Sequence, residues 1–144
     1  MELAPLQLSD YFVHSIHVEA VPDYDAEQPA DLDADALTVE KKCIPPAEDS
    51  PRRYGINLTI KQGEVKGKNL PYTYELRMFG FIDVIPDDLD ADRMQRLVEI
   101  NGPSMLFGAA REILRAATGR GPYGPVLIPS TTFYKPSKAP KAKA

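Results

Sequence analysis

The segment from Pro103 to Thr118 carries the strongest helix signal in the sequence, and it comes after several segments with strand-like patterns. Its apolar residues recur at the spacing of one helical face, at Leu106, Ala109, Ala110, Ile113, Leu114 and Ala117. Pro103 suits the first turn of a helix, where its missing N–H has no cost. The pattern therefore predicts a helix over 103–118, which Gly119 or Gly121 ends in the left-handed conformation.

Four upstream segments alternate apolar and polar residues with the period of a β-strand. The predicted strands are Leu6–Ala20, Ala36–Ile44, Tyr54–Lys61 and Tyr72–Val84. The last two flank a turn-rich segment and predict a hairpin. In the first strand, Phe12, His14, Ile16 and Val18 would share one face and Tyr11, Val13, Ser15, His17 and Glu19 the other. Both faces then carry bulky side chains, which suggests cover by a loop, a subunit or a ligand.

A second helical pattern runs from Leu89 to Ile100, with Asp88 as its expected cap. Strands followed by helices predict an α+β domain, a four-stranded antiparallel sheet with two helices packed on one side. With 144 residues the chain is long enough for one core. We expect a single domain over 1–134 and a disordered, lysine-rich tail over 135–144.

The composition favours a protein of the cytoplasm. Cys43 is the single cysteine, which excludes an internal disulfide and is consistent with a reducing compartment. The N-terminal segment lacks the pattern of a signal peptide, and no apolar run approaches the roughly 20 residues of a membrane span. We therefore expect neither export nor membrane insertion.

Charge is divided unevenly along the chain. Residues 1–50 hold 12 acidic and 2 basic side chains, and residues 51–144 hold 9 and 15. No basic stripe with interleaved aromatic residues lies in the predicted domain, which argues against nucleic acid as a partner. The acidic half is suited to a basic partner.

No pattern in the sequence predicts a metal site, a cofactor or catalysis. His14 and His17 would point to opposite faces of a strand, and the alternation at Asp31, Asp33 and Asp35 lacks the glycine and glutamate of a calcium loop. The GRGPYGP segment comes after a helix and has no lysine–serine pair, so it is interpreted as a return turn. Without a nucleophile and base pair, we predict that the chain is not an enzyme.

The helix and the segment after it resemble the SecB export chaperone family. The resemblance rests on Leu106-Phe107-Gly108-Ala109-Ala110-Arg111-Glu112-Ile113, then Arg120-Gly121, Leu127-Ile128-Pro129 and Phe133, in matching order. It extends more weakly over the strands, from about Leu8 onward. The resemblance implies the same α+β shape, and a chaperone that keeps unfolded precursor proteins competent for translocation and hands them to the SecA motor.

Two other functions stay open beside this one. A SecB-like chain would continue after Phe133 into a second long helix and an acidic tail, whereas this sequence ends in lysine-rich residues. That difference leaves room for a relative dedicated to one client, such as an antitoxin. A third function is that of a small-ligand binding or enzyme domain with a pocket between helix and sheet.

Adaptable methionines and flat aromatic side chains are the groups that hold many different client sequences. The candidate client-binding residues are Phe12, Tyr74, Met78, Phe79, Phe81, Met105, Phe107 and Tyr123. The resemblance further implies an acidic docking surface for SecA on the exposed sheet face, matched here by Glu19 and Glu75. Ser15 and Thr73 depart from that family pattern.

Apolar surface is in excess for a monomer. The first and fourth strands carry bulky groups on both faces, and Gly108 and Ala109 would let another backbone approach the main helix closely. We predict a homotetramer, built as a dimer of dimers.

Overall fold

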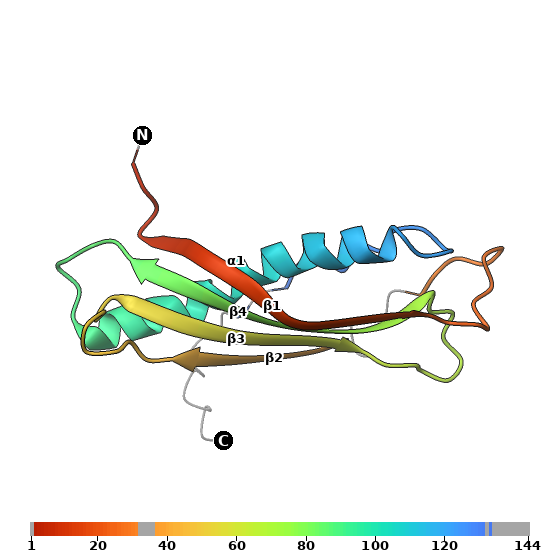
Figure 1. The fold of residues 1–144 in the computed structure, drawn as a ribbon, viewed down its shortest axis with the longest axis horizontal. Helices are drawn as coiled ribbons and strands as arrows, with labels where there is room; N and C mark the ends of the chain where they lie inside the picture. The colour runs from red at the N-terminus through yellow and green to blue at the C-terminus, as the bar shows by residue number, and fades with distance from the viewer. Residues whose placement is uncertain (1, 32–36, 132, 134–144) are drawn as a thin grey trace, which may run out of the picture.

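The computed structural model describes residues 2–31, 37–131 and 133. Its elements are β1 (Leu6–Ala20), β2 (Leu37–Ile44), β3 (Arg53–Gln62), β4 (Tyr72–Val84) and α1 (Ala91–Thr118). The strands form one antiparallel sheet in the order β1-β4-β3-β2, with α1 lying across one face (Figure 1). The α+β fold, the four-stranded sheet and the β3–β4 hairpin are thus confirmed. Residues 135–144 lie outside the described residues.

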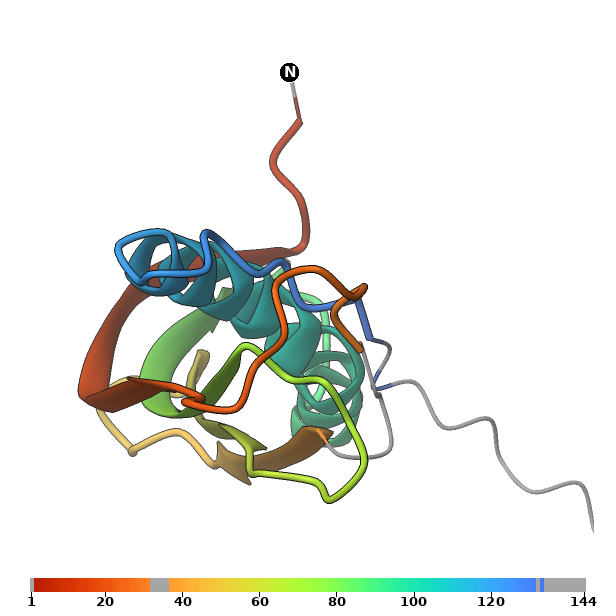
Figure 2. The ribbon, with the colours of Figure 1, turned by 90° about the vertical axis from the view of Figure 1, so that its right-hand side faces the viewer.

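The face of the sheet that α1 covers is called the inner face, and the opposite one the outer face. Figure 2 shows α1 on one side of the curved sheet. Within the described part of the chain, α1 is the only helix, and it is not long and apolar enough to cross a membrane. The outer face therefore has no helical cover from the described residues.

The prediction of two helices was wrong, because α1 runs unbroken for 28 residues through Pro103. A proline inside a helix cannot bond the carbonyl four residues earlier, here that of Glu99. The Lys41 ammonium donates to that carbonyl instead, at 3.2 Å. Asn101 also donates to the Leu97 carbonyl at 3.1 Å. These side chains supply hydrogen bonds near the interruption, so the helix continues.

The ends of α1 also differ from the prediction. Asp90 is the N-cap, and its carboxylate accepts from the Arg93 N–H at 2.8 Å. Gly119 ends the helix in the right-handed region, with φ −61°, so the expected left-handed cap is wrong. The described glycines with positive φ are Gly67 and Gly124.

The core lies between the inner face and α1. The alternating residues of β3 and β4 that point to this face are buried: Tyr54, Ile56, Leu58, Ile60, Tyr72, Tyr74, Leu76, Met78, Ile82 and Val84. From α1 the buried apolar residues include Val98, Leu106, Phe107, Ala110 and Leu114. The period-two and period-3.6 patterns of the sequence meet in this layer.

Two irregularities in the β1–β4 pairing change which side chains of β1 share a face. The register shifts between Leu8 and Asp10 and again between Val13 and Ser15. Phe12 lies opposite Phe79 on the outer face, whereas Ile16 lies opposite the buried Leu76. The prediction that Phe12, His14, Ile16 and Val18 share one face is therefore wrong, because each bulge reverses the alternation after it.

At Gly80, side chains of α1 and β1 approach the backbone of β4 closely. A Cβ built there would lie 3.0 Å from the Leu106 Cδ1 atom and 3.1 Å from the Leu8 Cδ1 atom. Gly80→Val should therefore lower the free energy of unfolding by about 1–3 kcal/mol, because two core side chains must move. Urea unfolding followed by circular dichroism measures the change. Gly63→Val is the matched control, since a Cβ at Gly63 meets nothing within 4 Å, and equal losses in both variants would contradict this account.

Candidate functional site

After α1 the chain runs back alongside the helix as an extended segment, residues 119–131, which we call the strap (Figure 2). Two side chains of α1 hold it. The Thr118 Oγ1 atom accepts from the Val126 N–H at 2.9 Å. The Arg111 Nε atom donates to the Ile128 carbonyl at 2.8 Å. The strap is thus hydrogen-bonded to the helix at two points.

Tyr72 of β4 fixes the start of the strap from the sheet side. Its hydroxyl accepts from the Tyr123 N–H at 2.9 Å and donates to the Gly124 carbonyl at 3.0 Å. The tyrosine ring lies directly against Gly121, where a Cβ would come within 2.6 Å of the hydroxyl oxygen. Glycine at this position therefore serves a close approach, and the GRGPYGP segment is the return turn that its sequence predicted.

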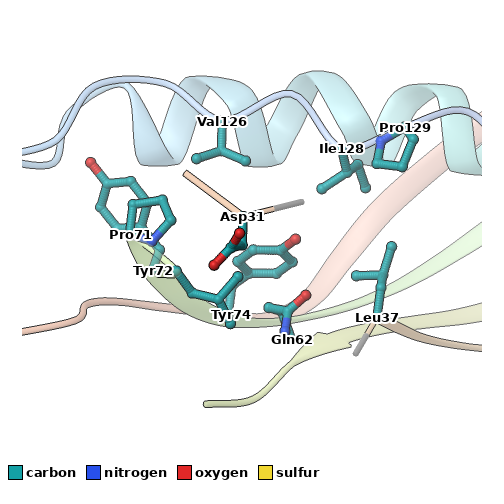
Figure 3. Close-up of a pocket in the computed structure, with 10 residues that line it drawn as sticks. Asp31, Leu37, Gln62, Pro71, Tyr72, Tyr74, Val126, Ile128 and Pro129 are labelled. Carbon is teal, nitrogen blue, oxygen red and sulfur yellow. The ribbon is translucent and has the colours of Figure 1, made fainter. Parts of the chain in front are cut away.

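A pocket opens between the strap and the inner face of the sheet, and we call it the under-strap pocket (Figure 3). Its lining residues are Asp31, Leu37, Gln62, Leu70, Pro71, Tyr72, Tyr74, Val126, Ile128 and Pro129. The space free of atoms, including the open mouth, is about 420 Å³, but the centre of a water-sized sphere moves in only about 30 Å³. Because one water needs roughly 10–15 Å³ by that measure, the closed pocket holds about two waters.

Tyr74 brings a hydroxyl to this apolar pocket. The side chain is 6% exposed, and none of the described residues hydrogen bonds to its hydroxyl. Its ring points into the space between the strap and β2 (Figure 3). Burial raises the pKa of Tyr74 to about 12, because the low-dielectric surroundings disfavour the phenolate. A bound group with a hydrogen-bond acceptor would satisfy this hydroxyl.

Asn69 fixes the acidic loop that borders the pocket. Its side chain donates to the carbonyls of Asp25 and Pro29 at 2.9 and 3.1 Å, and accepts from the Asp25 N–H at 2.9 Å. Its backbone N–H donates to the Asp31 carboxylate, and its carbonyl accepts from the Asp31 N–H at 2.9 Å. The loop is therefore held against the β3–β4 connection, with Asp31 at the pocket wall.

A second apolar surface lies on the outer face, and we call it the aromatic band. It consists of Phe12, Phe79 and Phe81, with Ile44 and Gly55 beside them. The rings of Phe12 and Phe79 stack with centroids 5.4 Å apart, and Phe79 and Phe81 meet edge to face at 5.0 Å. Since Phe12 is 45% exposed, the band is open to a partner.

The predicted client-binding residues thus separate into three groups. Phe12, Phe79 and Phe81 lie together in the aromatic band. Tyr74 lines the under-strap pocket, and Tyr123 lies in the strap with its ring 5.7 Å from that of Tyr72.

The remaining candidate residues lie in or beside the core. Met78 and Phe107 are 1% and 2% exposed, so a client cannot reach their side chains. Met78 points to the inner face, as the alternation of β4 predicts. Phe107 is buried beside Leu106, although it lies outside the predicted apolar stripe of the helix. Met105 is half-buried at the edge of the core.

Glu19 and Glu75 both lie on the outer face, because His17 pairs with Glu75 and Glu19 pairs with Thr73 across β1 and β4. The Glu75 charge is locally compensated, because Glu75 contacts Arg77 at 2.9 Å and Lys61 at 3.8 Å. Glu19 lies 3.2 Å from the His17 ring. The Glu75 pairs leave little net negative charge at that position for a basic partner.

The sequence prediction missed a third surface, on the inner-face side of β1. Tyr11, Val13 and Ile16 are 44%, 37% and 44% exposed there, and we call them the β1 edge surface. The bulky residues on both faces of this strand were the signal that it needs cover. The strand pattern of the sequence did not predict the two bulges that place these three residues on one side.

The histidine, cysteine and acidic residues that the structure describes form no metal-binding cluster. Phe12 contacts the His14 ring at 5.0 Å, and His17 lies opposite the outer-face Glu75. The prediction that His14 and His17 lie on opposite faces is therefore wrong, again because of the bulge. Among the residues that the structure describes, no group of three or more His, Cys, Asp or Glu is placed to bind a metal ion. Burial raises the pKa of the Cys43 thiol.

Comparison with known proteins shows which fold the chain has. No protein-family model matches the sequence, and no curated protein matches it. Among solved structures, the chain is similar to the Mycobacterium tuberculosis Rv1957 SecB-like chaperone in complex with a ChAD peptide from the Rv1956 HigA1 antitoxin, with a TM-score of 0.51, 14% identity, and coverage of 92% of this chain and 94% of that one. A protein of unknown function from Streptococcus agalactiae matches with a TM-score of 0.47, 12% identity, and coverage of 86% and 96%. The chain therefore has the SecB-like fold.

An alkaline titration tests the position of Tyr74. Its folded pKa is about 12, above the ordinary value of 10.0, so the stability it contributes is complete below pH 10 and is lost as the pH rises toward 12. In Tyr74→Phe, tyrosinate absorbance should lack the last step near pH 12, and stability should fall less over that range. Tyr54, whose pKa burial also raises, remains in both proteins as an internal reference. Loss of a tyrosinate step near the ordinary pKa of 10.0, in place of the step near pH 12, would show that Tyr74 is exposed in solution.

Proposed function

We propose that this protein is a chaperone that binds non-native polypeptides and holds them unfolded, and that it acts in the cytoplasm without catalysis. The observation that carries the proposal is the SecB-like fold, shared over 92% of the chain with a chaperone solved with a peptide bound. The exposed aromatic band and the under-strap pocket support it, because a holdase needs apolar surface that accepts many sequences.

The under-strap pocket is suited to one apolar side chain of an extended client. Pockets for small metabolites usually enclose roughly 300–1,000 Å³, and the closed space here is far smaller. This argues against a small-ligand site in the under-strap pocket. Apart from Asp31, Gln62 and the two tyrosines, the lining residues are apolar, so a small aliphatic side chain would enter and a client carbonyl would accept from Tyr74.

Delivery of precursors to SecA for Sec-dependent translocation is the first candidate for the step after holding. It requires a docking surface, and Glu19 with Glu75 is the one proposed. The ion pairs of Glu75 with Arg77 and Lys61 favour the second candidate, a chaperone dedicated to one client such as an antitoxin. The peptide in the similar solved complex comes from an antitoxin, which supports the same candidate.

We propose further that the protein assembles with itself, as a tetramer built from two dimers. Within the described sheet, β1 is an edge strand that pairs only with β4. It leaves the β1 edge surface open, and Met105, Ala109 and Ile113 lie half-buried on the flank of α1 opposite Phe107 and Arg111. Edge strands with exposed apolar side chains pair readily with a second chain.

Holding is tested by diluting an unfolded, unrelated protein into buffer with and without this protein. At stoichiometric amounts we expect slower refolding and less aggregation. Filling the pocket in Val126→Trp should weaken the binding of a short fluorescent apolar peptide about tenfold, or about 1.4 kcal/mol. Leu127→Trp is the matched control, because Leu127 is the next strap residue and is 49% exposed. Unchanged refolding of the unrelated protein would contradict the function, and equal peptide affinity in all three proteins would remove the pocket from it.

Assembly is tested by light scattering at micromolar concentration. We expect a particle about four times the 16.0 kDa chain mass. Val13→Asp with Ile16→Asp should reduce that mass, since an unpaired charge buried at an interface costs several kcal/mol. Both residues are exposed in the single chain, so its fold should survive, as circular dichroism will show. A wild-type monomer would contradict assembly, and an unchanged particle in the double variant would place the interface elsewhere.

A further inference from the structure

We propose that the aromatic band is a second client-binding surface, one that takes uncharged, aromatic-rich segments of a non-native chain on the face opposite the under-strap pocket. This inference rests on the proposed holding function and extends it. It assigns the outer face of the sheet to the client itself, where the family resemblance would place a docking surface for a basic partner.

The rings of the band are fixed before a client arrives. Phe79 lies over Gly55, where a Cβ would come within 2.7 Å of the Phe79 Cζ atom, and Ile44 borders the same glycine. Phe12 stacks on Phe79 with an interplanar angle of 30°. Because these side chains are already ordered, binding to them loses little conformational entropy. A flat aromatic surface of this kind accepts offset or edge-on rings from many sequences.

The charges around the band determine the chemistry of its occupant. On one side Asp83 accepts from Arg53 at 2.8 Å and also from the Ser9 hydroxyl. The Arg53 guanidinium also lies 5.4 Å from the Phe81 ring centroid. The Arg53 partner holds the pKa of the Asp83 carboxyl below its usual range, so this pair remains ionised and mutually satisfied at neutral pH.

On the other side of the band Glu75 is held between Arg77 and Lys61. Both flanks therefore present carboxylates that already have cationic partners. A strongly basic or acidic partner would have to break these pairs, whereas an uncharged apolar segment would not. The paired charges on both sides of the aromatic band thus favour an uncharged polypeptide segment over a charged docking partner.

The two client surfaces lie on opposite faces of one sheet. A client must therefore be long to occupy both surfaces at once. The pocket is lined by inner-face residues such as Tyr74, and the band by outer-face residues such as Phe79. A short peptide can occupy only one of them at a time. A long unfolded chain can pass around a sheet edge and occupy both, and the second contact then forms at high effective concentration.

Phe12→Ser and Phe81→Ser, made separately, test this inference in the full chain. The probes are a short fluorescent apolar peptide and reduced, carboxymethylated α-lactalbumin as a permanently unfolded long client. We expect the affinity for the long client to fall about tenfold in each variant, and that for the short peptide to stay within about twofold. Ile85→Ser is the matched control, because Ile85 is 40% exposed outside both surfaces and its loss should change neither affinity.

A photo-crosslinking phenylalanine derivative at Phe12 gives a second readout if either serine variant unfolds. It should attach to the long client, and the attachment should persist from about 50 to about 500 mM NaCl, because the contact is not ionic. Unchanged long-client affinity, or crosslinks only to a second copy of this chain with a loss of particle mass in the variants, would overturn the inference. Failure of the wild-type protein to bind either probe would instead overturn the proposed holding function.

Discussion

The whole architecture depends on one constraint: a four-stranded sheet has two faces, and the described chain has a single helix to cover them. α1 buries the apolar side chains of β3 and β4 on the inner face. Among the described residues, no comparable layer covers Phe12, Phe79 and Phe81 on the outer face. A sheet with aromatic groups on its solvent side is unusual for a protein that works alone. This exposure is the physical reason for proposing that the outer face binds a partner.

The sequence predicted those parts of the fold that neighbouring residues determine by themselves. It failed where a contact between distant residues decides the structure. The alternation in β3 and β4 is a local pattern, and it gave the correct strands and the correct buried face. The apolar stripe of α1 gave a helix but only part of its buried face, because Phe107 and Thr118 outside the stripe are buried. Pro103 was different. It is a helix start by local rules, but Lys41, some sixty residues away, supplies the hydrogen bond to the Glu99 carbonyl that lets α1 continue. A tertiary contact overrode a local signal, which no window of the sequence could reveal.

The site was predicted less completely, for a similar reason. Phe12, Phe79 and Phe81 were predicted as candidate client-binding residues, but their grouping depends on the bulges in β1, which set Phe12 opposite Phe79. A shift of one residue sends a side chain to the other face, so Ile16 shares a face with Tyr11 and Val13, whereas the unbroken alternation placed it opposite them. The under-strap pocket depends on contacts between segments far apart in the chain, such as Tyr72 with Gly121 and Asn69 with Asp31.

The two edges of the sheet show how the exposed surface is managed. β2 carries Lys41 and Lys42 and is followed by Pro45 and Pro46, which are the residues that discourage pairing with another strand. The 15 residues of β1 include no lysine, arginine or proline, and this edge is protected by its bulges and by the charges of Asp10 and Glu19. A further strand can therefore add to the sheet more readily at β1 than at β2. An open edge beside exposed Tyr11, Val13 and Ile16 is physically consistent with a chain that works while this edge is covered, by a second copy or by the polypeptide it holds.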